Sequence, residues 1–169
     1  MQQTAHKKHL ASATLSLNVA VIITSDTRNE KTDKTGNVIA GILQNAGHKC
    51  VLRKIVKNNL ALIRAEVKKA LKAADIVITS GGTGIGKKDV TLDAVSALIA
   101  RKLEGFGELF RLLSFGEIGS TAIMSRALLG VTRDGKIICT LPGSPNAVAL
   151  ALNKLLLPEL AHICWELNR

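Results

Sequence analysis

Apolar and polar residues alternate in blocks along the first half of the chain. Three short apolar runs predict β-strands at residues 19–23, 50–56 and 75–79. The first run is rich in β-branched residues and ends in a polar turn, which is typical of a strand buried on both faces. Apolar residues at helical spacing predict a helix after each of the first two strands, begun by Asp33 or Thr35 and by Asn58 or Asn59, respectively.

The second half of the chain continues this alternation and adds a hairpin. Residues 91–100 and 105–113 are predicted to be helical. Within residues 126–141, an Asp-Gly pair at 134–135 separates two apolar runs. This is the strongest short-range sequence pattern of a β-hairpin.

A last helix is predicted to begin at Pro145 or Asn146. Pro158 should interrupt or kink it, because proline lacks the N–H that a helix interior requires. Strands that alternate with helices predict a three-layer, doubly wound α/β fold with a mostly parallel sheet and helices on both faces. The hairpin adds an antiparallel edge to that sheet.

The length of 169 residues suits one domain with a substantial core, and 47% of the residues are hydrophobic. We expect a flexible basic tail at residues 1–14 and a single domain over residues 15–169. The apolar run after this tail is interrupted by Ser16 and Asn18, which argues against a secretion signal. No run approaches the roughly 18 apolar residues that span a bilayer, so no membrane partner is expected.

Charge and residue usage narrow the choice of partners. The net charge of +10 suits polyphosphate or nucleic-acid ligands, although solvated helix faces such as residues 67–72 account for many of the lysines. Three Phe, one Trp and no Tyr leave few rings on which bases could stack, which argues against a nucleic-acid partner. Cys50, Cys139 and Cys164 lack the spacing of a metal or disulfide site, which suits a reducing cytoplasm.

Three of the apolar strands end in short polar turns. These turns lie at residues 24–27, 80–84 and 141–145. Ligands of open α/β sheets bind beyond the carboxyl ends of parallel strands, where such turns meet. We therefore expect the three turns to converge on one ligand pocket.

The turn at residues 80–84 has the composition of a phosphate cradle, because glycine lets backbone N–H groups approach an anion and the next helix adds its positive end. The predicted phosphate-binding residues are Ser80, Gly81, Gly82, Thr83 and Gly84. A P-loop does not fit, since Lys88 occupies the position of the Ser or Thr that binds magnesium, and the dinucleotide fingerprint is absent. The alternative is that the glycines only form a tight turn.

Two carboxylates accompany these turns. Asp26 ends the first strand and Asp89 follows the glycine turn, so both can face one phosphate cluster. Carboxylates beside phosphates are typical of a magnesium site, although a cap or turn role is the alternative for Asp26. Asp93 is interpreted as a partner of the helix dipole, and Thr91 as the N-cap of that helix.

Several motifs in succession resemble the MoaB/MogA family of molybdopterin-binding proteins. They lie at residues 80–91, 105–114, 124–126 and 141–147, within a resemblance that covers roughly residues 17–160. Separate motifs in this order are far more specific than one glycine turn. The resemblance implies the same doubly wound α/β fold.

The resemblance also implies a reaction in molybdenum or tungsten cofactor synthesis. The terminal phosphate of molybdopterin would attack the α-phosphorus of ATP and give adenylyl-molybdopterin and pyrophosphate. Asp26 and Asp89 would be catalytic and hold Mg²⁺, and the turn at residues 81–84 would hold the nucleotide phosphates. The residues implied to face the pterin are Ser114, Arg126, Pro142, Gly143 and Ser144.

The resemblance leaves alternatives for activity and for oligomeric state. Lys88 stands where the family often has Arg, which keeps the charge but loses bidentate phosphate geometry. Some family members resemble the enzyme but are inactive, so the alternative is a catalytically silent molybdopterin-binding carrier or scaffold. The intact motif at residues 142–147 favours activity. Homo-oligomers are implied, either trimers or hexamers, and residues 117–119 resemble the hexameric MoaB branch. The downstream metal-insertion enzyme is a further candidate partner.

Overall fold

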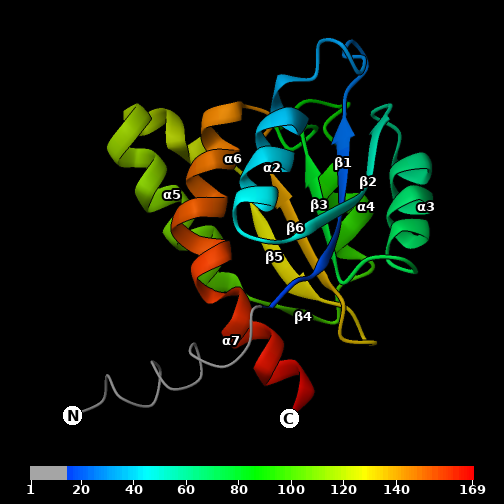
Figure 1. Ribbon diagram of the computed structural model, residues 1–169. Coiled ribbons are helices and arrows are strands. Elements are labelled where there is room, and N and C mark those ends of the chain that lie inside the picture. Colours follow the sequence, from blue (N-terminus) through cyan, green and yellow to red (C-terminus); the bar gives the residue numbers. More distant parts are fainter. Residues whose placement is uncertain (1–14) are drawn as a thin grey trace.

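The computed structural model describes residues 15–169, and the predicted tail at residues 1–14 lies outside the described residues. A six-stranded sheet has the order β2-β1-β3-β6-β5-β4 (Figure 1). The strands are β1 Asn18–Thr24, β2 Lys49–Val56, β3 Ile76–Ser80, β4 Arg101–Lys102, β5 Leu128–Val131 and β6 Ile137–Leu141. Strands β2, β1, β3 and β6 pair in parallel, whereas β5 and β4 pair antiparallel. The predicted mostly parallel sheet is therefore confirmed.

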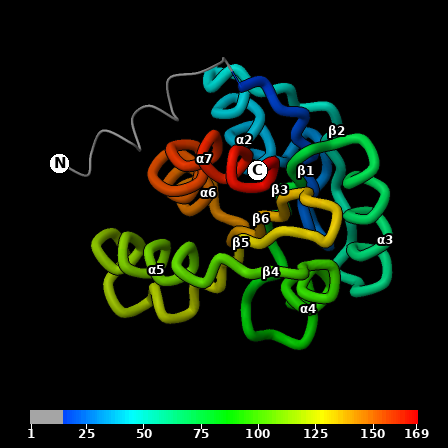
Figure 2. The backbone as a smooth tube through the Cα atoms, turned by 90° about the horizontal axis from the view of Figure 1, so that it is seen from below, coloured from blue at the N-terminus to red at the C-terminus, as the bar shows by residue number. Residues whose placement is uncertain are grey.

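Helices cover both faces of this sheet, as predicted. One face carries α2 Lys34–Asn45, α5 Glu104–Ile118, α6 Pro145–Ala151 and α7 Leu157–Asn168, and the other carries α3 Leu60–Ala70 and α4 Thr91–Ser96 (Figures 1 and 2). Successive side chains of β1 reach both layers, since Val21 packs with α2 and α6 whereas Ile22 packs with α3 and α4. Both are fully buried, so β1 is a central strand.

Two predicted helix starts are confirmed by their caps. Asp33 Oδ1 accepts the Gly36 N–H at 2.8 Å at the start of α2, and Asn59 Oδ1 accepts the Leu62 N–H at 3.1 Å at the start of α3. These side chains satisfy N–H groups that have no partner within the helix. The end of α2 is followed by Gly47 with φ +80°, a left-handed conformation that glycine adopts readily and that commonly ends helices.

The segment between α4 and β5 differs from the prediction. The helix expected at residues 91–100 ends at Ser96, and Ala100 N–H donates to Val131 O instead. The two-residue strand β4 follows and pairs outside the predicted hairpin, so β5 is not the sheet edge. The next helix, α5, extends to Ile118 and continues as the 3₁₀-helix η1 Gly119–Met124.

The C-terminal helices form one continuous rod. The π-helix η2 Leu152–Leu156 joins α6 to α7 just before Pro158, and the Leu157 N–H donates to Leu152 O, five residues back. This wider turn accommodates Pro158 within the rod, so the predicted interruption takes the form of a π-helix. By length and composition alone, Pro145–Asn168 could cross a membrane, but Leu152 and Leu156 of this segment pack in the core of the domain.

Candidate functional site

The carboxyl ends of β1, β3 and β6 lie side by side, because these strands are parallel neighbours in register. Ile23 pairs with Ser80, and Ser80 pairs with Leu141. The turns that follow the three strands therefore meet at one edge of the sheet, as the sequence predicts.

Direct hydrogen bonds join these three turns. The Gly81 N–H donates to Leu141 O at 3.1 Å, and Ser80 Oγ donates to Pro142 O at 2.9 Å. Thr24 Oγ1 donates to Gly81 O from the end of β1. The glycine turn is thus held from both neighbouring strands.

Thr91 contributes to the same network and is not the N-cap of α4. Its Oγ1 donates to Thr24 Oγ1 at 3.0 Å, and Val90 occupies the cap position without a side-chain hydrogen bond. The predicted cap was wrong because this tertiary contact uses the hydroxyl. Asp93 lies in the first turn of α4, as its interpretation as a dipole partner requires.

Both the backbone conformation and the close neighbours favour glycine at positions 81 and 82. Gly81 has φ +97°, and a Cβ there would lie 2.4 Å from Thr24 O. Gly82 has φ +59°, and a Cβ there would lie 2.4 Å from Asn58 Oδ1. Since no L side chain fits at either position, the turn keeps a bare backbone surface.

The glycine turn offers N–H groups to a ligand. Within residues 15–169, the N–H groups of Gly82, Thr83, Gly84 and Ile85 have no hydrogen-bond acceptor. Successive free N–H groups of this kind form concavities that bind anions. Lys87 and Lys88 are exposed on the same loop and add positive charge.

Asp26 follows β1 and contacts the segment that follows β2. Its Oδ1 accepts the Asn58 N–H at 3.0 Å, and its carbonyl accepts Lys57 Nζ at 2.6 Å. The Asn58 backbone hydrogen bond keeps the pKa of Asp26 below its ordinary value of 3.8, with help from Lys88 and Lys57. The residue is partly exposed, so solvent and ligands can reach it.

Asp89 closes its own loop. Its Oδ2 accepts the Gly86 N–H at 3.0 Å. A Cβ on Gly84 or Gly86 would lie 2.6 or 2.9 Å from that same oxygen, so both glycines make room for the carboxylate. The Asp89 side chain therefore lies against the glycine loop at residues 84–86.

These acids do not form a metal cage by themselves. Among residues 15–169, no group of three or more His, Cys, Asp or Glu side chains could hold a metal ion. Mg²⁺ usually takes one or two carboxylates and completes its shell with substrate phosphates and water. Two carboxylates, such as those of Asp26 and Asp89, are as many as a site of this kind takes from the protein.

A cavity of about 670 Å³ lies next to the turn after β6. Three of the predicted pterin residues, Ser114, Pro142 and Ser144, line it, whereas Arg126 and Gly143 do not. Sequence reasoning missed other polar residues of its wall, namely Glu117, Ser125, Asn146, Asn153 and Lys154. Another cavity, of about 640 Å³, lies between α5 and α7 and contains no predicted site residue.

The two remaining residues predicted to face the pterin, Gly143 and Arg126, contact other parts of the protein. Gly143 O accepts Thr35 Oγ1 at 2.8 Å. Arg126 Nε donates to Thr83 O at 2.7 Å, and its Nη2 donates to Gly84 O. Ser144 lines the cavity and also contacts the protein backbone, since its Oγ accepts the Ala147 N–H as the N-cap of α6.

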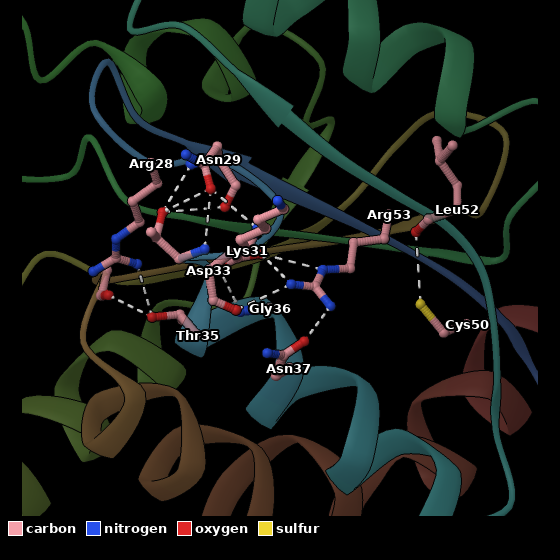
Figure 3. Close-up of polar contacts among 12 residues, drawn as sticks. Arg28, Asn29, Lys31, Asp33, Thr35, Gly36, Asn37, Cys50, Leu52 and Arg53 are labelled. Carbon is pink, nitrogen blue, oxygen red and sulfur yellow. Dashed lines mark hydrogen bonds and ion pairs between the residues drawn. The ribbon is translucent and has the colours of Figure 1, made fainter.

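Residues at the start of α2 contact the Gly143 turn, and Figure 3 shows three of the side chains involved, Arg28, Thr35 and Arg53. Arg28 Nη1 donates a hydrogen bond to Thr35 Oγ1 at 2.9 Å, and Thr35 Oγ1 donates one to Gly143 O. Arg53 reaches across from β2 to Asp33, at the N-cap of α2. Sequence reasoning found the Asp33 cap and missed its link to the site, since its partner Arg53 belongs to another element.

A family model described as "Probable molybdopterin binding domain" matches residues 20–162. The match includes the sheet from β1 onward and all three turns. It also includes the cavity-lining residues named above.

Relatives resemble the chain over nearly its whole length. Molybdenum cofactor biosynthesis protein B of Bacillus cereus is 46% identical over 172 residues, which cover 100% of this chain and 99% of that protein. A crystal structure of a Molybdenum cofactor biosynthesis protein B has a TM-score of 0.89 at 46% identity and covers 94% of this chain and 99% of its own. The tungsten cofactor synthesizing protein MoaB from Pyrococcus furiosus has a TM-score of 0.83 at 32% identity, with 91% and 98% covered.

Proposed function

This chain belongs to the family described as "Probable molybdopterin binding domain", and from that premise we propose that it is a molybdopterin adenylyltransferase of molybdenum or tungsten cofactor synthesis. Its substrates are molybdopterin and ATP. The cytoplasm is the compartment that we expect, since Cys50, Cys139 and Cys164 are free thiols.

The observation that carries this proposal is the contact between the glycine turn and the cavity. Ser80 Oγ donates to the carbonyl of Pro142, which lines the cavity. A Cβ on Gly143 would lie 3.3 Å from Gly81 Cα, so the two backbones touch. Loop N–H groups without acceptors therefore border a cavity whose lining mixes polar and apolar residues, which suits a heterocycle whose phosphate reacts with a nucleotide.

The reaction forms one bond and breaks one. A phosphate oxygen of molybdopterin bonds to the α-phosphorus of ATP, and the bond from that phosphorus to the β-phosphate oxygen breaks to release pyrophosphate. The attacking phosphate is already ionised, so the protein needs no strong general base. The chain's task is to hold both substrates in line and to stabilise charge, with the free N–H groups of residues 82–85 at the nucleotide phosphates.

We propose that the two carboxylates bind a magnesium ion. Asp26 and Asp89 would hold Mg²⁺ together with the nucleotide phosphates, and the ion would supply neutralisation of phosphate charge. Hydrogen bonds from Asn58 favour the ionised form of Asp26, which is the form that binds a cation. The exposed Lys88 lies near enough to favour that ionised form.

We also propose that the chain works as a homo-oligomer, a trimer or a hexamer. Exposed apolar side chains gather on α5 and η1, namely Leu109, Leu112, Phe115, Ile118, Ile123 and Met124, and their exposed fractions range from 46% to 81%. Several large apolar side chains exposed on one segment are typical of a protein interface. A second copy of the chain, which carries the same apolar surface, is the partner that we assign to it.

The test is a coupled assay with purified protein, molybdopterin, ATP and Mg²⁺ that follows pyrophosphate and adenylylated pterin. We expect Mg²⁺-dependent product that Asp26→Ala and Asp89→Ala abolish, while the control Asp134→Ala, on the exposed β5–β6 turn, retains turnover. Tight pterin binding without pyrophosphate release would refute the transferase and identify the silent binder.

A further inference from the structure

Arg126 lies between η1 and β5 and directs its guanidinium at the backbone of the glycine loop. Nε donates to Thr83 O at 2.7 Å. Nη2 donates to Gly84 O and, at 3.4 Å, to Asp89 O. One side chain thus holds the loop at its start and at its end.

These contacts decide which way the loop peptides face. In a trans peptide the C=O of one residue and the N–H of the next point in opposite directions. Because the carbonyls of Thr83 and Gly84 are held toward Arg126, the N–H groups of Gly84 and Ile85 point away from it. Both N–H groups lack an acceptor within residues 15–169.

We propose that Arg126 is a positioning residue for the nucleotide, which acts by holding the N–H groups of the loop toward the phosphates of ATP. This inference rests on the proposed adenylyl transfer and gives Arg126 a different role from the pterin contact implied by the family resemblance. Arg126 does not line the cavity next to the turn after β6. Its positive charge also lies beneath a loop that receives anions, which favours phosphate binding.

Arginine suits this role for geometric reasons. A planar guanidinium donates in two directions at once, so it can hold the carbonyls of Thr83 and Gly84 together. Lysine would keep the charge but donate from a single atom. Arg126→Lys should therefore restore only part of what Arg126→Ala loses.

The first experiment tests the loop without any turnover. Lys87 and Lys88 are exposed trypsin sites within the held segment. For Arg126→Ala we expect cleavage after these lysines to become on the order of tenfold faster, because losing hydrogen bonds to a charged donor frees the loop. Arg126→Lys should lie between Arg126→Ala and the unmodified protein. The control Arg133→Ala removes the same charge from the exposed β5–β6 turn and should cleave at the unmodified rate.

The second experiment measures binding of the two substrates separately by calorimetry. The probe for the nucleotide site is the magnesium complex of α,β-methylene ATP, which cannot release pyrophosphate. We expect Arg126→Ala to raise its Kd on the order of tenfold, with the Kd for molybdopterin unchanged. In the adenylyl-transfer assay, the KM for ATP should rise more than kcat falls.

Two results would overturn the role of Arg126. One is trypsin cleavage of Arg126→Ala at the unmodified rate, and the other is a raised molybdopterin Kd with unchanged binding of the ATP analogue. If Arg126→Ala does not fold, the same two comparisons made with Arg126→Lys decide the question. A lack of adenylyl transfer in the unmodified protein would refute the proposed function alone, because cleavage and analogue binding still test the loop.

Discussion

Arg53 on β2 forms an ion pair with Asp33 at the N-cap of α2, with Nη2 and Nε 2.6 and 3.1 Å from the same carboxylate oxygen (Figure 3). The Asp33 side chain is fully buried, whereas the Arg53 side chain is 29% exposed. The other carboxylate oxygen caps α2 through the Gly36 N–H. This pair fixes the start of the helix from which Thr35 holds the Gly143 turn.

Asp33→Asn should destabilise the protein substantially, because asparagine can still cap α2 but leaves Arg53 without its anion. We expect a loss of about 2–4 kcal/mol in the free energy of unfolding, less than for a fully buried pair because Arg53 is partly exposed. Urea unfolding measures it. The control Asp75→Asn disrupts the more exposed Asp75–Lys136 pair and should cost about 1 kcal/mol or less. Equal losses in the two variants would contradict a special role for the Asp33–Arg53 pair.

Gly81→Ala should damage the site far more than a comparable substitution elsewhere. Gly81 and Gly47 both have positive φ, +97° and +80°, but only Gly81 has a neighbour in the way, since a Cβ would lie 2.4 Å from Thr24 O. We expect Gly47→Ala to cost about 1 kcal/mol of stability from φ alone. Gly81→Ala should cost at least about 2 kcal/mol, because the turn has to move away from β1.

The measurement for this pair is thermal unfolding together with calorimetry of α,β-methylene ATP. Binding of the analogue should weaken in Gly81→Ala and stay unchanged in Gly47→Ala. If both variants bind the analogue as the unmodified protein does, the glycine turn at residues 80–84 is not the phosphate site.

The sequence predicted the sheet and the convergence of the turns, because both depend on local patterns. Apolar runs such as residues 19–23 specify buried parallel strands, and parallel neighbours bring their carboxyl ends to one edge. Asp33 could be recognised as a cap from its place before an apolar periodicity. These inferences need no knowledge of contacts between distant residues.

The contacts that the sequence did not predict join residues far apart in the chain. Thr91 has the sequence position of a cap, but its hydroxyl donates a hydrogen bond to Thr24 Oγ1 on another element. Arg126 contacts Thr83 and Gly84, about 40 residues earlier, only because α5 and η1 return the chain to the glycine loop. Strand β4 has two residues, too few to give any periodicity.

Phe115→Glu should dissociate the proposed oligomer. Phe115 is 61% exposed on α5 amid the other apolar side chains of α5 and η1, and a charge buried in an apolar interface is costly. We expect sedimentation velocity to show monomers at concentrations where the unmodified protein is assembled. Leu62→Glu places the same charge on a 53% exposed position of α3, on the opposite layer, and should leave the assembly intact. A monomeric unmodified protein would refute the oligomer.

Asp26 should contribute to stability and to turnover in a way that does not change across the neutral pH range. Its pKa lies below the ordinary value of 3.8, mainly because its carboxylate accepts the Asn58 N–H, with further help from Lys88 and Lys57. A folded-state pKa below the unfolded value means that the ionised carboxylate stabilises the fold above the unfolded pKa. That contribution is lost as the pH falls through the folded pKa.

The check is the difference in unfolding free energy between the unmodified protein and Asp26→Asn at several pH values. It should be constant between about pH 6 and 8 and should shrink below about pH 4, where the carboxylate begins to take up a proton in the unfolded chain. Turnover should likewise show no acid limb from this group between about pH 5 and 8. A difference that changes between pH 6 and 8 would mean that Asp26 titrates near neutrality, and that the Asn58 N–H does not hold it ionised.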